Sequence, residues 1–219
     1  MLFKFCKNIK LRNASNSIIS TDYPEFKNII YPFSNEFIKT MNRVNPQVTG
    51  RIIELIISNI FVNQNILMGK IYPIINDNPN LILRNIIMQN QSEFDVFVKQ
   101  INELSKNILE FPVNLQEDLS FKKLKFCYRR EYRCFADVTT SNTILDIKVV
   151  RKSFFLQNST TKLSKVGLQY FNQLMIYACG FNYKYDHWPE KLILFNCYTG
   201  EIITWTPSNQ DYIEFNKRL

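Results

Sequence analysis

Histidine and paired cysteines are scarce in this sequence, and their scarcity argues against several kinds of metal site. His187 is the only histidine, and the five cysteines include no C-x-x-C pair. Structural zinc sites and iron–sulfur clusters need several closely spaced ligands of these types. We therefore expect neither a structural zinc site nor an iron–sulfur cluster. The single histidine also argues against zinc hydrolases and histidine-based nucleases, which use several.

A secretory signal and a membrane-spanning run are also missing from the sequence. The opening segment, MLFKFCKNIKLRNASNS, has no apolar region of signal-peptide length, and no later stretch is long and apolar enough to span a bilayer. An odd number of cysteines without a signal is typical of a reducing compartment. We expect a soluble intracellular protein, cytoplasmic or nuclear, that is not secreted and has no membrane partner.

Acidic residues are fewer than basic ones, which bears on the partner. The 219 residues carry 27 Lys and Arg against 19 Asp and Glu, a net charge of +8, and 46% of them are hydrophobic, enough for one globular domain with a core. The charge favours a polyanionic partner, nucleic acid first and an anionic membrane surface second. A basic surface kept for solubility would explain it equally well. Abundant Asn and Ile indicate an AT-rich coding genome, such as that of a large DNA virus, plasmid or parasite.

The N-terminal half has the patterns of helices. The segment PQVTGRIIELIISNIFVNQNIL is too long for a strand and apolar nearly all round, which predicts a buried helix whose one acidic residue is Glu54. Apolar residues recur at helical spacing in SEFDVFVKQINELSKNIL and predict an amphipathic helix from Ser92 to about Leu109. The segment SNEFIKTMNRV also fits a short amphipathic helix.

The pattern changes after Pro112. The segment SFKKLKFCYRREYRCFADVTT alternates like an antiparallel strand pair, and TILDIKVV follows as a third strand. KLSKVGLQYFNQLMIYACGF returns to helical spacing, with Tyr170 in its packing stripe and Gly180 as its expected C-cap. EKLILFNCYTGEIITWTP then reads as a strand, a turn and a strand. This order predicts a mixed α/β protein.

Charged residues interrupt an otherwise ordinary hairpin in FADVTTSNTILDIKVV. Because strand side chains alternate, Asp137 should share one side of its strand with Thr139, while Ala136 and Val138 take the other. On the second strand Asp146 and Lys148 should likewise share a face, near Asp137 once the hairpin closes at the polar TTSN turn. Two carboxylates and an ammonium on a sheet face lose several kcal/mol of solvation unless they are paired, hydrated or bound to a metal.

In these residues the chain resembles the PD-(D/E)XK nuclease superfamily, in which an Asp on one strand is followed after a turn by Asp/Glu-x-Lys on the next. The matching residues are Asp137 and then Asp146-Ile147-Lys148. Family members commonly carry an acidic helix before the hairpin and a Gln-containing helix after it. Here these are the helix of Glu54 and the segment NQLMIYA, whose Gln173 and Tyr177 resemble the Gln-x-x-x-Tyr helix of the RecB and lambda-exonuclease branch.

The resemblance spans roughly Thr49 to Trp205 and leaves the long middle helices unmatched. The segment KLILFNCYTGEIITW is similar to the strand, Gly-containing turn and strand that often follow that helix. Ala136 stands where the family has its name-giving proline, a tolerable departure because that residue holds no metal. The cysteines of the iron–sulfur members are absent.

The resemblance implies a role for each matching residue. Asp137 and Asp146 would bind Mg²⁺, for which Mn²⁺ could substitute, and the Ile147 carbonyl would be a further ligand. Lys148 would activate the attacking water. Glu54 would complete the site from its helix.

The same resemblance implies residues that contact DNA. Gln173 and Tyr177 would line the site or contact the DNA backbone, and Gln169 lies on the same helix face. Lysines and arginines interleaved with Tyr and Phe around the hairpin suit a groove that follows phosphates and stacks bases. The residues predicted to bind nucleic acid are Lys122, Lys123, Lys125, Arg129, Arg130, Arg133, Arg151, Lys152, Lys162, Lys165 and Gln169.

Each candidate also has an ordinary structural explanation. Asp146 with Lys148 could be a surface ion pair that contributes little stability. Glu54 could mark the solvent edge of a hydrophobic helix, and Gln173 and Tyr177 could be half-buried helix residues.

We expect a restriction-endonuclease-like mixed central sheet flanked by helices, with an additional helical N-terminal half. Residues 1–48 form an N-terminal extension, and residues 49–219 form the nuclease core, including a helical segment at about 78–110. The expected function is a Mg²⁺-dependent DNA nuclease in DNA processing, replication or recombination, with exonuclease favoured over endonuclease. An inactive nuclease-fold protein that binds nucleic acid within a replication or transcription complex is the main alternative. A basic adaptor that binds protein or membrane would leave the charged hairpin unexplained.

Overall fold

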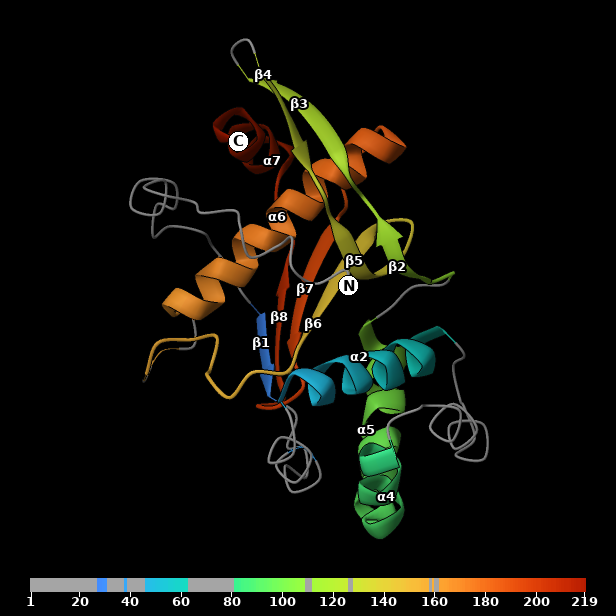
Figure 1. The fold of residues 1–219 in the computed structure, drawn as a ribbon. Coiled ribbons are helices and arrows are strands. Elements are labelled where there is room, and N and C mark those ends of the chain that lie inside the picture. The colour runs from blue at the N-terminus through green and yellow to red at the C-terminus, as the bar shows by residue number, and fades with distance from the viewer. Residues whose placement is uncertain are drawn as a thin grey trace.

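The computed structural model describes residues 27–30, 38, 46–62, 81–108, 112–125, 128–157, 159 and 162–219. Figure 1 shows its elements in chain order: β1 (Lys27–Ile30), α2 (Pro46–Val62), α4 (Leu81–Gln89), α5 (Gln91–Ile108), β2 (Asn114–Asp118), β3 (Phe121–Lys125), β4 (Tyr128–Tyr132), β5 (Phe135–Thr139), β6 (Thr143–Lys148), α6 (Lys165–Tyr185), β7 (Lys191–Asn196), β8 (Glu201–Trp205) and α7 (Asn209–Arg218). The α/β class predicted from the sequence is confirmed. The short helix expected over SNEFIKTMNRV lies outside the described residues apart from Ile38.

A six-stranded sheet in the order β1-β8-β7-β6-β5-β2 forms the centre of the molecule. β6 and β7 run parallel, with α6 between them in the chain, whereas all other neighbours pair antiparallel. The sheet is therefore mixed, as the sequence predicted. β1 belongs to the segment expected as an N-terminal extension, yet it adds a strand to the sheet by pairing with β8.

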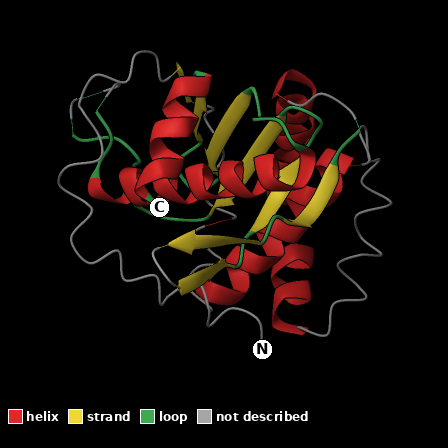
Figure 2. Ribbon diagram, turned by 90° about the horizontal axis from the view of Figure 1, so that it is seen from above, coloured by secondary structure: helices red, strands yellow, loops and turns green. Residues whose placement is uncertain are grey.

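Helices cover both faces of the sheet (Figure 2). One core cluster, which contains the buried residues of α2 and α5, includes Ile53, Ile57, Phe97, Leu145 and Phe195. The other, which contains those of α6 and α7, includes Ile144, Phe171, Leu174, Leu194 and Tyr212. Within the described ranges, no helix has the length and apolarity needed to cross a membrane.

β3 and β4 form a separate two-stranded ribbon. The sequence predicted one strand pair over this region, but the chain makes three strands, because it leaves the ribbon at Arg133 and Cys134 before β5 enters the central sheet. Figure 1 shows the ribbon beside α7 and the C-terminal half of α6, at the end of the molecule opposite α2.

α6 is longer than its sequence pattern predicted. It does not end at Gly180 but continues to Tyr185, where Asp186 adopts a left-handed φ of 60° and its N–H bonds the Asn182 carbonyl at 2.9 Å. The glycine serves packing instead, because a Cβ built on Gly180 would lie 1.9 Å from the Leu119 carbonyl oxygen. The helix can approach the β2–β3 connection this closely only because residue 180 lacks a side chain.

We predict opposite effects for two Gly→Ala substitutions in helices. Gly180→Ala forces backbone apart and should lower the free energy of unfolding by about 1–3 kcal/mol, measured by urea denaturation. Gly50→Ala in α2 is the matched control, because its nearest neighbour is Val149 Cβ at 4.0 Å. It should raise stability by up to about 1 kcal/mol through helix propensity alone. Equal effects of the two changes would contradict this account of Gly180.

Candidate active site

The two strands that carry the predicted acidic residues separate where those residues occur. The ladder between β5 and β6 ends at the pair Val138↔Leu145. Beyond it, the Asp137 carboxylate takes the place of a backbone acceptor, and its Oδ2 accepts a hydrogen bond from the Ile147 N–H at 2.7 Å. The side chain of Asp137 therefore fills the gap between the strands and fastens one to the other.

The regular alternation of β5 breaks at the same residue. Ala136 belongs to the core on the α6 side of the sheet, and Val138 to the core on the α2 side. The prediction that these two residues share a face is therefore wrong. The reason is the interrupted ladder, which lets the strand change its facing at Asp137.

Asp146 and Lys148 form a buried ion pair on β6. The Lys148 ammonium lies 2.5 Å from Asp146 Oδ2, and the two side chains are 16% and 1% exposed. Tyr170 of α6 covers the ammonium, with its ring centre 5.1 Å from Nζ. Among the residues that the structure describes, the Lys148 ammonium is the donor that faces Asp146 Oδ2. The surface ion pair considered for these residues is thus excluded by their burial.

Glu54 of α2 approaches Asp137 through a third side chain, Gln116 of β2. The Gln116 amide nitrogen donates to Glu54 Oε1 at 3.0 Å and to Asp137 Oδ1 at 3.3 Å. Gln116 has a left-handed φ of 48°, and it lies between the ladder pairs Leu115↔Val138 and Glu117↔Ala136, opposite Asp137. We call Glu54, Asp137 and Asp146 the carboxylate cluster.

Burial and the neighbouring charges shift the pKa values of Asp137, Asp146 and Lys148. Burial raises the pKa of Asp137 to about 7; Lys148 opposes the rise, and Glu54 adds to it. Burial likewise raises the pKa of Asp146 to about 7, against Lys148 and with a contribution from Asp137. Burial alone would lower the pKa of Lys148, but the carboxylates of Asp146 and Asp137 raise it above its ordinary value. Lys148 is therefore held as an ammonium.

The donors of the cluster suit Mg²⁺, which takes oxygen ligands. Buried Asp146 faces Asp137 and carries the Lys148 ammonium on its Oδ2. Among the described residues, however, no three His, Cys, Asp or Glu side chains are arranged as a metal centre. Lys148 lies against Asp146, and the Gln116 amide lies between Glu54 and Asp137. The residue types fit the ion, but these two side chains contact the oxygens that it would use.

α6 contributes differently from what the resemblance implies. Gln173 donates a hydrogen bond to the Tyr177 hydroxyl, and Tyr177 is buried in the core between α6 and the sheet. Tyr170, about one helical turn before Gln173, is the residue whose ring lies over the Lys148 ammonium. The sequence pattern assigned Tyr170 to packing, so its contact with the site was missed. Gln116 was missed as well, because its segment was assigned to no element.

The chain that leaves β6 is held in place by buried Asn196. The Asn196 side chain accepts from the Val150 N–H at 3.3 Å and donates to the Lys152 carbonyl at 3.2 Å. The Cys197 N–H also donates to the Lys148 carbonyl at 2.9 Å. These bonds fix the backbone at and just after Lys148.

Glu201 holds the next part of that connection. Its carboxylate accepts from the Ser153 hydroxyl and from the Phe154 N–H, the latter at 2.9 Å. α6 then packs tightly on this turn, since a Cβ on Gly167 would lie 2.1 Å from the Phe154 carbonyl oxygen. The turn thereby sets where the first half of α6, with Tyr170, lies over the sheet.

The predicted nucleic-acid-binding residues fall into two separate groups. The first group follows β6 and enters α6, and all of its side chains are exposed: Arg151, Lys152, Lys162, Lys165 and Gln169. Arg151 and Lys152 come three and four residues after Lys148. This group lies next to the carboxylate cluster in the chain.

The second group lies on the β3–β4 ribbon, at the end of the molecule opposite α2 (Figure 1). Lys122 and Arg133 are exposed there, and Arg133 lies 3.7 Å from Glu131. The Lys123 ammonium bonds the carbonyl of Asn216 and, at 2.8 Å, its side-chain oxygen. This contact ties the ribbon to α7. The ribbon also carries Lys125, Arg129 and Arg130, whose side chains the structure does not describe.

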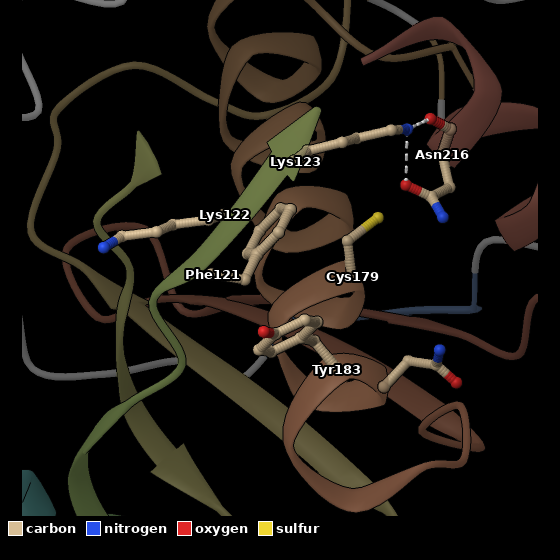
Figure 3. Close-up of a pocket in the computed structure, with 7 residues that line it drawn as sticks. Phe121, Lys122, Lys123, Cys179, Tyr183 and Asn216 are labelled. Atoms are coloured by element: carbon tan, nitrogen blue, oxygen red, sulfur yellow. Dashed lines mark hydrogen bonds between the residues drawn. The ribbon is translucent and has the colours of Figure 1, made fainter. Parts of the chain in front are cut away.

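A shallow groove of about 140 Å³ lies at this ribbon (Figure 3). The Cys179 thiol faces it from α6, and burial raises its pKa to about 12, so it is not a nucleophile. Buried Cys134 and Cys197, like Cys179, form no disulfide. The residues that line the groove are Phe121, Lys122, Lys123, Cys179, Asn182, Tyr183 and Asn216. It contains no carboxylate and is not part of the carboxylate cluster.

Comparison with known proteins adds no assignment: no family model, no curated protein and no solved structure matches this chain.

We predict that Asp137→Asn stabilises the protein in EDTA at pH 8. The folded-state pKa is raised, so wild-type stability falls as pH rises from about 4 to about 7, where only the unfolded state has released the proton. An amide oxygen can still accept the Ile147 N–H, and the variant avoids the buried charge. The gain should be about 1 kcal/mol at pH 8, about 2–4 °C in Tm, and smaller at pH 5. Destabilisation at both pH values would contradict the raised pKa.

Glu117→Gln is the matched control with the opposite sign. Burial alone would raise the pKa of Glu117, but hydrogen bonds from Lys184, Thr139 and Tyr185 lower it. A lowered pKa contributes stability above the ordinary value of 4.5 that is lost as pH falls through the folded-state value. Glu117→Gln should therefore cost about 1–2 kcal/mol at pH 7 and less at pH 3.

Proposed function

We propose that this protein is a metal-dependent DNA nuclease with a restriction-endonuclease-like core. The observation that carries the proposal is that half-buried Glu54, buried Asp137 and the Asp146–Lys148 pair come together from three separate elements. Buried carboxylates cost stability when they are charged. Groups with such raised pKa values are common at active sites. An ordinary surface ion pair or a single buried charge would not bring together charged residues from α2, β5 and β6.

The order of elements supports the same proposal. An acidic residue on a helix, an Asp on one strand, Asp-x-Lys on the next and a second helix follow one another as in the PD-(D/E)XK superfamily. β7 and β8 then follow, joined by a turn in which Gly200 has a φ of 72°. The mixed sheet agrees with this arrangement.

Each residue has a role in the proposal. Asp137, Asp146, Glu54 and the carbonyl of Ile147 supply hard oxygen donors for Mg²⁺ or Mn²⁺. When bound, such an ion lowers the pKa of water and stabilises charge on a phosphate. The Asp137 side chain also fixes the distance between β5 and β6, so the donors stay together.

Lys148 acts chiefly through its charge. Its pKa is raised by the neighbouring carboxylates, so it stays protonated and is a poor proton acceptor in this state. An ammonium can orient water and stabilise negative charge on phosphate oxygens. Tyr170 packs over it and restricts its movement.

DNA is the proposed partner, with the exposed group at the start of α6 as its main contact. Arg151, Lys152, Lys162 and Lys165 can each neutralise a phosphate. An exonuclease that processes DNA in replication or recombination is favoured over an endonuclease. The alternative is an inactive nuclease-fold protein that binds nucleic acid. The lack of a ready metal centre among the described residues favours that alternative.

Digestion of end-labelled linear and closed-circular DNA, with Mg²⁺, Mn²⁺ or EDTA, tests the proposal. Cleavage that EDTA abolishes is expected, and resistant circles would identify an exonuclease. Lys148→Ala should lower the cleavage rate by about 10²–10⁴-fold with DNA and Mg²⁺ binding retained. Asp146→Asn should instead weaken Mg²⁺ binding, because a neutral amide is a poorer ligand.

Lys184→Ala is the matched control for Lys148→Ala. Lys184 bonds Glu117 at 2.8 Å, so this variant also removes an ammonium from a buried carboxylate, but outside the carboxylate cluster. It should lose stability, and its cleavage rate should fall far less than that of Lys148→Ala. Folded wild-type protein that binds DNA yet cuts neither single- nor double-stranded substrates with either ion would end the nuclease proposal in favour of the alternative.

Charge removal should distinguish the two basic groups on a short duplex of about 10 base pairs, ~34 Å long. The double change Arg151→Ala/Lys152→Ala should lower the slope of log Kd against log salt by about 2, because each phosphate contact contributes about 0.9. Lys122→Ala/Arg133→Ala on the ribbon removes the same charge and should change the slope far less. Equal losses would show that DNA also reaches the ribbon.

A further inference from the structure

Gln116 occupies a conformation that an ordinary strand residue avoids. Its φ of 48° lies in the left-handed region, which costs a residue with a Cβ about 1–2 kcal/mol. The strand cannot relax, because ladder pairs hold it to β5 on both sides of Gln116. The next residue, Glu117, is anchored by Lys184, Thr139 and Tyr185. The fold therefore keeps this strained residue in place.

The strain directs the Gln116 amide into the carboxylate cluster. Its nitrogen lies 3.0 Å from Glu54 Oε1 and 3.3 Å from Asp137 Oδ1. The other oxygen of Asp137 already accepts the Ile147 N–H. The single Gln116 amide nitrogen thus contacts two oxygens, one on each carboxylate, that a cation shared by Glu54 and Asp137 would need.

A second observation is that a cation already neutralises the neighbouring carboxylate. Asp146 is buried, with 1% of its surface exposed. The Lys148 ammonium at 2.5 Å supplies charge there. The Gln116 amide lies beside Glu54 and Asp137 as the Lys148 ammonium lies beside Asp146. The amide is uncharged, so it contributes only its dipole there.

We propose that the Gln116 amide holds the cation position between Glu54 and Asp137 in the metal-free protein and must leave it before a divalent cation binds both carboxylates. The inference rests on the proposed function and adds a residue that sets metal affinity. Gln116 is a positioning residue here, since it acts through the two carboxylates. It weakens cation binding by competing for the same oxygens, and it stabilises the protein while the ion is absent.

Calorimetric titration of Mg²⁺ and Mn²⁺ into the full chain at pH 8, without DNA, tests this. Gln116→Ala removes the competing donors and should lower Kd about tenfold, the effect of one hydrogen bond to a charged group. Gln116→Gly should do the same and also relieve the left-handed backbone, so it remains informative if the Ala variant folds poorly. Gln210→Ala, which removes an amide that bonds the Glu214 carboxylate at 3.0 Å on α7, should leave Kd unchanged.

Gln116→Met separates competition from structural support. It keeps about the length of the side chain but has no hydrogen-bond donors. Competition predicts a lower Kd and a lower Tm in EDTA, whereas support by shape predicts wild-type values for both. An unchanged or higher Kd in the Ala and Gly variants overturns the inference and leaves the nuclease proposal standing. If neither wild type nor any variant binds either ion, the metal site fails, and both proposals fail with it.

Discussion

The hydrogen bond from the Ile147 N–H to the Asp137 carboxylate is the interaction on which the rest of the site depends. It replaces a bond between backbones at the point where β5 and β6 part, so the hairpin stays joined although its ladder has ended. The gap it spans lets Asp137 sit between two hydrophobic cores instead of on one face of a strand. A carboxylate buried there loses solvation, and this bond offsets part of the loss.

Charge balance is the second constraint. Three carboxylates meet one ammonium, and burial raises the pKa of Asp137 and Asp146 because a single Lys148 cannot compensate them all. Hydrogen bonds supply part of the missing compensation. The Gln116 amide donates to Glu54 and Asp137, and the Ile147 N–H donates to Asp137. These bonds offset part of the free-energy cost of burying the carboxylates.

The surroundings serve to hold this arrangement rigid. Buried Asn196 and Glu201 form hydrogen bonds with the backbone of the chain after Lys148. α6 packs directly on that turn through Gly167. Tyr170 is thereby placed over Lys148, and the exposed basic residues follow at the start of α6. At the far end of the molecule, Lys123 and Asn216 tie the β3–β4 ribbon to α7.

The sequence by itself determined the α/β class, the helices of Glu54 and of Phe97, and the two strands that carry Asp137 and Asp146, because hydrophobic period and turn residues are local properties. It also identified Asp146 and Lys148 as neighbours, since strand parity needs only their spacing. Tertiary structure alone decided the rest. The change of facing at Asp137 depends on where two strands part, and the role of Gly180 depends on how near Leu119 comes. The place of Gln116 depends on a ladder formed with β5, a strand about 20 residues away, and no local pattern marks such a contact.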